Sequence, residues 1–199
     1  MRYGTTGLPV PGYELRIVGD DGRECGAGEI GELQISGPSA AIMYWNNRAK
    51  SRHTFVGAWT RSGDKYLRDP DGYYVYCGRS DDMLKVSGIY VSPVEVEAAL
   101  ISHGAVLEAA VIGSPDSDEL IKPKAFVVVR EEALTSVASE AGQVALAAEL
   151  KEHVKDRLSK HKYPRWVAFV DELPRNDRGK VDKKALKERE ARGESPRGH

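Results

Sequence analysis

The sequence has little cysteine, no long apolar run and almost no net charge. Cys25 and Cys77 are the only cysteines among 199 residues, and they form no CxxC pair. Neither a disulfide framework nor a structural zinc site is therefore expected. No apolar run approaches the roughly 20 residues that a membrane-spanning helix requires.

Charge and targeting signals are equally sparse. Lys and Arg number 29 against 30 for Asp and Glu. The chain thus lacks the basic excess that favours binding to nucleic acid or to a membrane surface. No secretory apolar segment follows Met1. We therefore expect a cytoplasmic protein with no nucleic-acid partner and no membrane partner.

Familiar catalytic signatures are also absent. The sequence contains no HExxH metal motif and no GxSxG nucleophile elbow. The histidines are scattered without the spacing of metal ligands: His53, His103, His153, His161 and His199. No metal site is expected within the chain.

Residues 1–80 have the pattern of short strands joined by turns. Polar and apolar residues alternate over 13–18 and 31–37, and two further stretches, 59–66 and 73–77, flank the hairpin-like turn signal Asp69-Pro70-Asp71-Gly72. Strands this short and rich in turns are typical of a small barrel or sandwich.

From residue 81 the pattern becomes mixed. Ser92, Pro93 and Glu95 have the spacing of a helix start with a capping box. Buried strands are expected at 109–112, 125–129 and 166–170, an amphipathic helix at 143–160 and a charged helix at 181–191. The predicted fold class is α+β, with a β-rich segment followed by a small domain whose central sheet is flanked by helices.

Three short stretches could carry chemistry. In the first, Asp64 follows Ser62-Gly63, where a carboxylate can accept hydrogen bonds from two sugar hydroxyls. The commoner alternative is a turn aspartate that binds its own backbone.

The second stretch runs from Gly78 to Gly88. Arg79 can grip a phosphate or ribose, and Gly88 lets the backbone approach a ligand closely. The alternative is a charged linker that ends in an ordinary turn glycine.

The third stretch is 174–180. It ends in Gly-Lys but is not a phosphate-binding P-loop, because Pro174 and Val181 occupy positions that need Gly and Ser or Thr. It delivers Lys180, whose ammonium could neutralise charge that develops on a phosphate. The alternative is a solvated basic loop.

The order and spacing of the three stretches resemble the C-terminal part of the adenylate-forming superfamily, which includes acyl-CoA synthetases, peptide-synthetase adenylation domains and luciferases. Residues 73–88 are most similar to the aryl-CoA ligases, among them the benzoate–CoA ligases. The resemblance extends from Tyr3 to about Arg189.

The resemblance implies roles for individual residues in the first half-reaction. Asp64 would bind the ribose hydroxyls of ATP, and Arg79 would contact ribose and phosphate. Lys180 would be the catalytic lysine of adenylation.

It also implies roles in the second half-reaction, in which coenzyme A is the acceptor. Asp81 would be the hinge about which the C-terminal domain turns. Ser87 and Gly88 would then line the tunnel for the pantetheine of coenzyme A.

The family's phosphate loop, acyl pocket and acidic magnesium ligand have no match in the sequence. We therefore expect the C-terminal part of such an enzyme: 1–80 from the large adenylation domain with its barrel subdomain, 81–190 the mobile domain, and 191–199 a disordered tail. The substrates would be ATP, coenzyme A and a small aromatic carboxylate, the partner the N-terminal adenylation domain, and Mg²⁺ would bind outside this chain.

Two other readings stay open at this stage. An isolated remnant that keeps Asp64 and Arg79 could be a non-catalytic module that binds a nucleotide or a protein. Nucleic-acid binding by the basic C-terminal loop and helix is disfavoured by the balanced charge.

Overall fold

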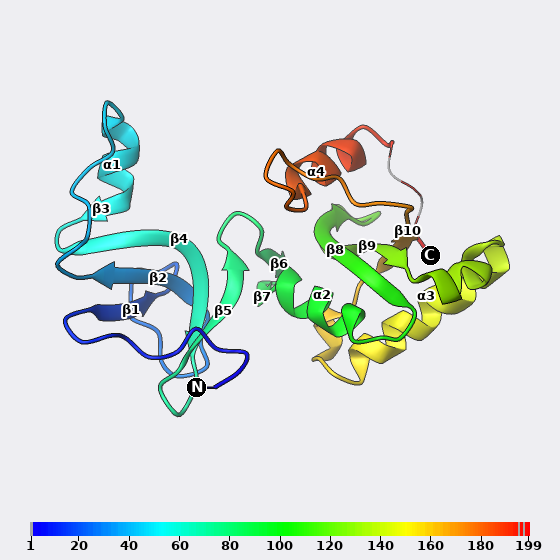
Figure 1. The fold of residues 1–199 in the computed structure, drawn as a ribbon, viewed down its shortest axis with the longest axis horizontal. Helices are drawn as coiled ribbons and strands as arrows, with labels where there is room; N and C mark the ends of the chain where they lie inside the picture. The colour runs from blue at the N-terminus through cyan, green and yellow to red at the C-terminus, as the bar shows by residue number, and fades with distance from the viewer. Residues whose placement is uncertain (1, 195, 197) are drawn as a thin grey trace. The chain divides into compact units, whose positions relative to one another are not determined.

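The computed structural model describes residues 2–194, 196 and 198–199. The chain divides into two compact units, Met1–Met83 (unit 1) and Leu84–His199 (unit 2) (Figure 1). The division falls three residues after the expected boundary at 80.

Unit 1 is built on one five-stranded antiparallel sheet, where the turn-rich strands had suggested a barrel or sandwich. β1 (Glu14–Val18), β2 (Gly31–Ser36), β4 (Trp59–Arg68) and β3 (Phe55–Val56) follow one another in the sheet, and β5 (Tyr74–Arg79) also pairs with β4. The predicted turn joins β4 to β5, with the Gly72 N–H donating to the Asp69 carbonyl at 3.0 Å. The helix α1 (Arg48–Thr54) precedes β3.

The two faces of this sheet differ in character, because successive side chains of a strand point to opposite faces. One face carries a small apolar cluster of Ile17, Leu33 and Tyr74. The alternate residues of β2 include Glu32, whose carboxylate meets Arg61 at 2.6 Å. Buried charges are tolerated here because they are paired.

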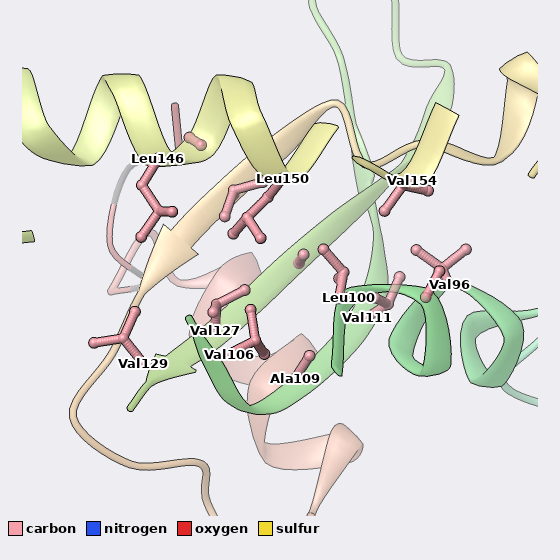
Figure 2. Packing of buried hydrophobic residues seen from close by; sticks show 14 of the residues in the cluster. Val96, Leu100, Val106, Ala109, Val111, Val127, Val129, Leu146, Leu150 and Val154 are labelled. Atoms are coloured by element: carbon pink, nitrogen blue, oxygen red, sulfur yellow. The ribbon is translucent and has the colours of Figure 1, made fainter. Parts of the chain in front are cut away.

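Unit 2 has a three-stranded sheet with helices on both faces. β8 (Val106–Pro115) is antiparallel to β9 (Ile121–Val129), and β10 (Trp166–Phe169) is parallel to β9. The helices α2 (Pro93–Ile101) and α3 (Glu140–Lys155) pack on the face that carries Val111 and Val127. Figure 2 shows Leu146 and Leu150 of α3 directed toward these strands.

The opposite face of the unit 2 sheet is covered by α4 (Lys183–Ala191), with Leu186 packed against Phe126 and Ile112. The remaining short elements are β6 (Leu84–Val86), β7 (Ile89–Val91) and the 3₁₀ helices η1 (Glu131–Val137) and η2 (Lys160–Lys162). Mixed helices and strands confirm the predicted α+β class.

The sequence pattern predicted the start of one helix correctly and the bounds of another incorrectly. Ser92 caps α2 as predicted, accepting from the Glu95 N–H at 3.2 Å. The helix expected at 143–160 instead begins at Glu140 and ends at Lys155. The Ser139 side chain caps its start, and Leu158 packs on the core from the turn beyond its end. Leu158 thus fits the four-residue apolar spacing of the helix although it lies beyond the helix end.

The last residue of the chain pairs with a strand of its own unit. The expected tail 191–199 includes residues 195 and 197, which lie outside the described residues. His199 exchanges two backbone hydrogen bonds of 3.0 Å with Val167 of β10. In the described part of the chain, no helix has the length and apolar character needed to cross a membrane.

Candidate functional site

Asp64 and Arg79 lie directly opposite each other on β4 and β5. The Arg79 Nε atom is 3.3 Å from the Asp64 Oδ1 atom, and the side chains are 58% and 30% exposed. The pair therefore retains donors and carboxylate surface that a ligand could reach.

The backbone around Asp64 is fixed by a tight local arrangement. Gly63 has φ +74°, a conformation that residues with a Cβ rarely adopt. Its carbonyl accepts from the Ser80 N–H at 2.9 Å, and the Asp64 N–H donates to the Ser62 hydroxyl at 3.1 Å. The glycine in the Ser-Gly-Asp stretch thus serves the strand geometry that pairs Asp64 with Arg79.

A cavity of about 610 Å³ adjoins this pair within unit 1. Arg79, Gly63 and Asp81 line it, together with Lys50 and His53 of α1. Asp64 is not among the lining residues; it reaches the cavity through its contact with Arg79. Lysine and arginine side chains outnumber acidic ones in the lining, which suits an anionic ligand.

Asp81 lies in the turn that ends unit 1. The N–H groups of Asp82 and Met83 both donate to the Arg79 carbonyl, at 3.0 and 3.1 Å. Asp81 is therefore held one turn beyond the arginine, next to the division between the units.

Ser87 and Gly88 form the two-residue turn between β6 and β7 of unit 2. Both have positive φ, 51° and 82°, as the mirror-image turns of tight hairpins require. A Cβ at Gly88 would meet nothing within 4 Å. The turn itself thus requires the glycine, as in the turn-glycine alternative, and the role of Gly88 beside a ligand stays a prediction.

Ser87 lines a second cavity, of about 410 Å³, within unit 2. Lys122, His161 and Arg165 supply nitrogen donors to its wall, and Asp116 lies 3.9 Å from Lys122. The His161 Nε2 atom is buried and has no hydrogen-bond partner in the described residues. This wall offers unused hydrogen-bonding capacity beside the Ser87–Gly88 turn.

Lys180 is exposed at the end of a hairpin loop between β10 and α4. Asn176 and Lys180 close the loop, with the Asn176 N–H donating to the Lys180 carbonyl at 2.8 Å. The Asn176 side-chain oxygen accepts from the N–H groups of Arg178 and Lys180, at 3.0 and 3.1 Å. The lysine is presented by an ordered loop rather than by a free chain.

The structure thus groups the predicted residues into three sets. Asp64, Arg79 and Asp81 gather in unit 1, while the Ser87–Gly88 turn and Lys180 occupy two different hairpins of unit 2. The sequence reading missed Lys50 and His53, because a seven-residue helix with little apolar pattern gives no signal that it borders a cavity.

One tyrosine near the unit 1 site has a pKa that differs from its ordinary value. Burial, followed by the nearby Asp64 carboxylate, raises the pKa of Tyr76 on β5. Its hydroxyl stays neutral in the physiological range. In the described residues, no three His, Cys, Asp or Glu side chains gather closely enough to hold a metal ion.

Comparison with known families and proteins gives consistent results. The AMP-binding enzyme C-terminal domain matches residues 95–180, and the AMP-binding enzyme domain matches residues 1–45. The chain is 60% identical to the benzoate–CoA ligase of Thauera aromatica over 94% of its own length and 34% of that protein. It spans about a third of the length of the curated relatives it matches.

Solved structures of CoA ligases share this fold, and two of them are compared with the chain. A benzoate CoA ligase from Burkholderia xenovorans LB400 is 56% identical with a TM-score of 0.80, over 94% of this chain and 36% of that one. The anthranilate CoA ligase AuaEII in complex with anthranoyl-AMP is 49% identical with a TM-score of 0.83, over 94% and 35%.

The chain therefore belongs to the AMP-binding, adenylate-forming enzyme family. Within that family it is a benzoate–CoA ligase-like protein, as its 54–60% identity to two such ligases shows.

Proposed function

We propose that the chain supplies the C-terminal part of an AMP-forming aryl-CoA ligase that acts on benzoate or a close aromatic relative. The observation that carries this proposal is that the chain, 60% identical to a benzoate–CoA ligase, has the Asp64–Arg79 pair beside a cavity whose lining is richer in lysine and arginine than in acidic residues. An acid and an arginine at this spacing suit the hydroxyls and phosphate of a nucleotide.

The proposed reaction has two halves. A carboxylate oxygen attacks the α-phosphorus of ATP, the bond to pyrophosphate breaks, and an acyl-adenylate forms. The thiol of coenzyme A then loses its proton to solvent and attacks the acyl carbon, and AMP leaves. The reaction would take place in the cytoplasm, where both cosubstrates are available.

Lys180 would act in the first half. Its ammonium would neutralise the negative charge that accumulates between the carboxylate and the α-phosphate. An exposed lysine on an ordered hairpin loop can reach such a site at little entropic cost.

Asp81 and the Ser87–Gly88 turn would act in the second half. A turn of unit 2 about Asp81 would withdraw Lys180 and bring Ser87 and Gly88 to the substrate, as in other hinge transitions. The cavity beside Ser87, with Lys122 and Arg165 in its wall, has donors for the phosphates of coenzyme A. Mg²⁺ would be held by residues outside this chain.

A chimeric enzyme tests this proposal. The chain would replace the corresponding last third of the Thauera aromatica ligase, and benzoate-dependent release of AMP and formation of benzoyl-CoA would be measured. We expect both products from the chimera and neither from the chain alone. A folded chimera that binds ATP but never activates benzoate would refute the proposal in favour of a non-catalytic binding module.

A further inference from the structure

The loop that carries Lys180 has almost no apolar support of its own. Residues 175–180 are all exposed, between the buried Leu173 and the half-buried Val181. Its conformation must therefore come from polar contacts, and those contacts decide where the ammonium of Lys180 is presented.

One side chain ties this loop to the sheet. The Arg175 Nη2 atom lies 2.6 and 2.8 Å from the two carboxylate oxygens of Glu108, which stands on β8. The Arg175 Nη1 atom donates to the Gly179 carbonyl at 3.0 Å. The guanidinium thus connects a rigid strand to the residue immediately before Lys180.

Arg175 contacts the loop at Gly179, the residue with the least common backbone conformation in the loop. Gly179 has φ +74° and donates its N–H to the Asn176 carbonyl at 2.8 Å. Without an external tie, a glycine can leave this conformation easily, because it has few steric restrictions. Arg175 holds the carbonyl of that glycine in one direction.

The far side of the loop is fixed independently. Lys183, at the start of α4, lies 2.7 Å from the Glu97 carboxylate, and both side chains are largely buried. Arg175 and Glu108 are by contrast 46% and 38% exposed. A half-exposed ion pair adds little to global stability, so its main effect is local.

We propose that Arg175 is a positioning residue: held by Glu108 and bound to the Gly179 carbonyl, it orients the loop that presents Lys180 for adenylation. The proposal rests on the proposed function of Lys180. A planar guanidinium suits this role because its donors point in fixed directions, whereas the ammonium of lysine is a single point charge.

Amide hydrogen exchange in the full chain tests the contact itself. We expect Arg175→Gln to speed exchange at Gly179 and Lys180 about tenfold, because their N–H groups would be released by local opening. Exchange at Val111 and Val127 in the sheet should not change. Arg178→Gln is the matched control, since that arginine lies in the same loop and its side chain forms no ion pair in the described residues.

Kinetics of the chimeric enzyme test the role. Arg175→Gln should lower kcat for benzoyl-adenylate formation about tenfold, as small misplacements of a reacting group do, and leave KM for ATP and benzoate unchanged. Arg175→Lys should resemble Arg175→Gln, and Arg178→Gln should resemble the wild type.

The outcomes separate the two proposals. Faster exchange at Lys180 with an unchanged kcat would overturn the positioning role, and so would unchanged exchange. Arg175→Lys with wild-type behaviour would overturn the importance of the planar fork. The last outcome combines faster exchange in Arg175→Gln with an unmutated chimera that never adenylates benzoate. It would support the contact of Arg175 with Glu108 and Gly179, and it would overturn the proposed function.

Discussion

Lys180 carries its charge on a loop whose backbone is closed by Asn176, so its side chain can be removed without loss of the loop. In the chimeric enzyme we expect Lys180→Ala to slow benzoyl-adenylate formation about a hundredfold, the usual cost of one preorganised charge-stabilising group. Transfer to coenzyme A from supplied benzoyl-adenylate should change far less. Single-turnover measurements of each half-reaction provide the test.

Arg178→Ala serves as the comparison for Lys180→Ala, because it removes a cation from the same loop. Equal rates of adenylate formation for wild type and Lys180→Ala would show that Lys180 is a solvated surface charge.

The backbone conformation of Gly88 leads to a prediction about the free energy of unfolding that does not depend on the proposed ligase activity. Its φ of 82° is strained for any residue with a Cβ, although a Cβ there would meet nothing within 4 Å. Gly88→Ala should therefore lower the free energy of unfolding by about 1 kcal/mol. Gly104→Ala is the matched control, because Gly104 is equally unobstructed but has no positive φ. Urea unfolding of both variants compares them; equal losses would contradict the conformational explanation.

At the level of elements, two histidines contribute to the contact between α3 and the residues that follow α2. The His153 ring contacts the Ser102 hydroxyl at 2.9 Å and lies edge-on to His103, with 4.8 Å between the ring centroids. His103 in turn contacts Glu149 at 3.1 Å. Burial, then Arg157 and His103, lower the pKa of His153, while a hydrogen bond with the Ala99 backbone and the Asp156 charge oppose them.

The lowered pKa of His153 predicts that the free energy of unfolding decreases as the pH falls. A lowered pKa means that folded His153 binds its proton less tightly than the unfolded chain does, so protonation favours unfolding. The stabilisation is full above the unfolded pKa of about 6.5 and is lost as the pH falls below it. Urea unfolding between pH 7.5 and 5, followed by circular dichroism at 222 nm, should show this decline.

His153→Gln should reduce the decline between pH 7.5 and 5, since Gln cannot be protonated there. His53→Gln, at an exposed position on α1, should keep the wild-type profile. The histidine explanation would fail if the two variants had the same profile.

Element prediction from the sequence worked where a periodic pattern was long enough. β1 and β2 show the alternation of half-buried strands, β4 and β5 were predicted from the turn signal between them, and the Ser92 cap marked the start of α2 correctly. The hairpin of β6 and β7 could not be predicted, because three-residue strands contain too little of a period. The sequence indicated Ser87 and Gly88 as a possible turn, but not the two strands that this turn joins.

Prediction of the candidate site likewise worked for local motifs and failed for contacts between distant segments. Asp64 and Arg79 were found as separate motifs, and the strand register brings them together. The tie between Arg175 and Glu108 joins residues 67 positions apart. No local pattern encodes it, since the contact depends on how β8 lies beside the loop after β10.

On the scale of the whole molecule, the two units differ in how well each can bury apolar surface. Unit 2 encloses a core cluster of 18 buried residues between α2, α3 and the sheet (Figure 2). The apolar cluster of unit 1 contains three, Ile17, Leu33 and Tyr74. The opposite face of that sheet carries paired charges such as Glu32 and Arg61, which contribute little net stability.

The two units should consequently behave differently when they are separated at the division between Met83 and Leu84. We expect residues 84–199 to unfold cooperatively on heating, since their core lies entirely within them. Residues 1–83 should show no cooperative transition, because a cluster of three buried apolar residues with a few half-buried neighbours cannot offset the conformational entropy of some 80 residues. Circular dichroism melts of the two pieces provide the measurement, and limited proteolysis of the full chain should leave a resistant product that begins near Asp81. A cooperative melt of 1–83 beside a featureless 84–199 would contradict this division of stability, and would mean that the ion pairs of the unit 1 sheet hold it together without a larger core.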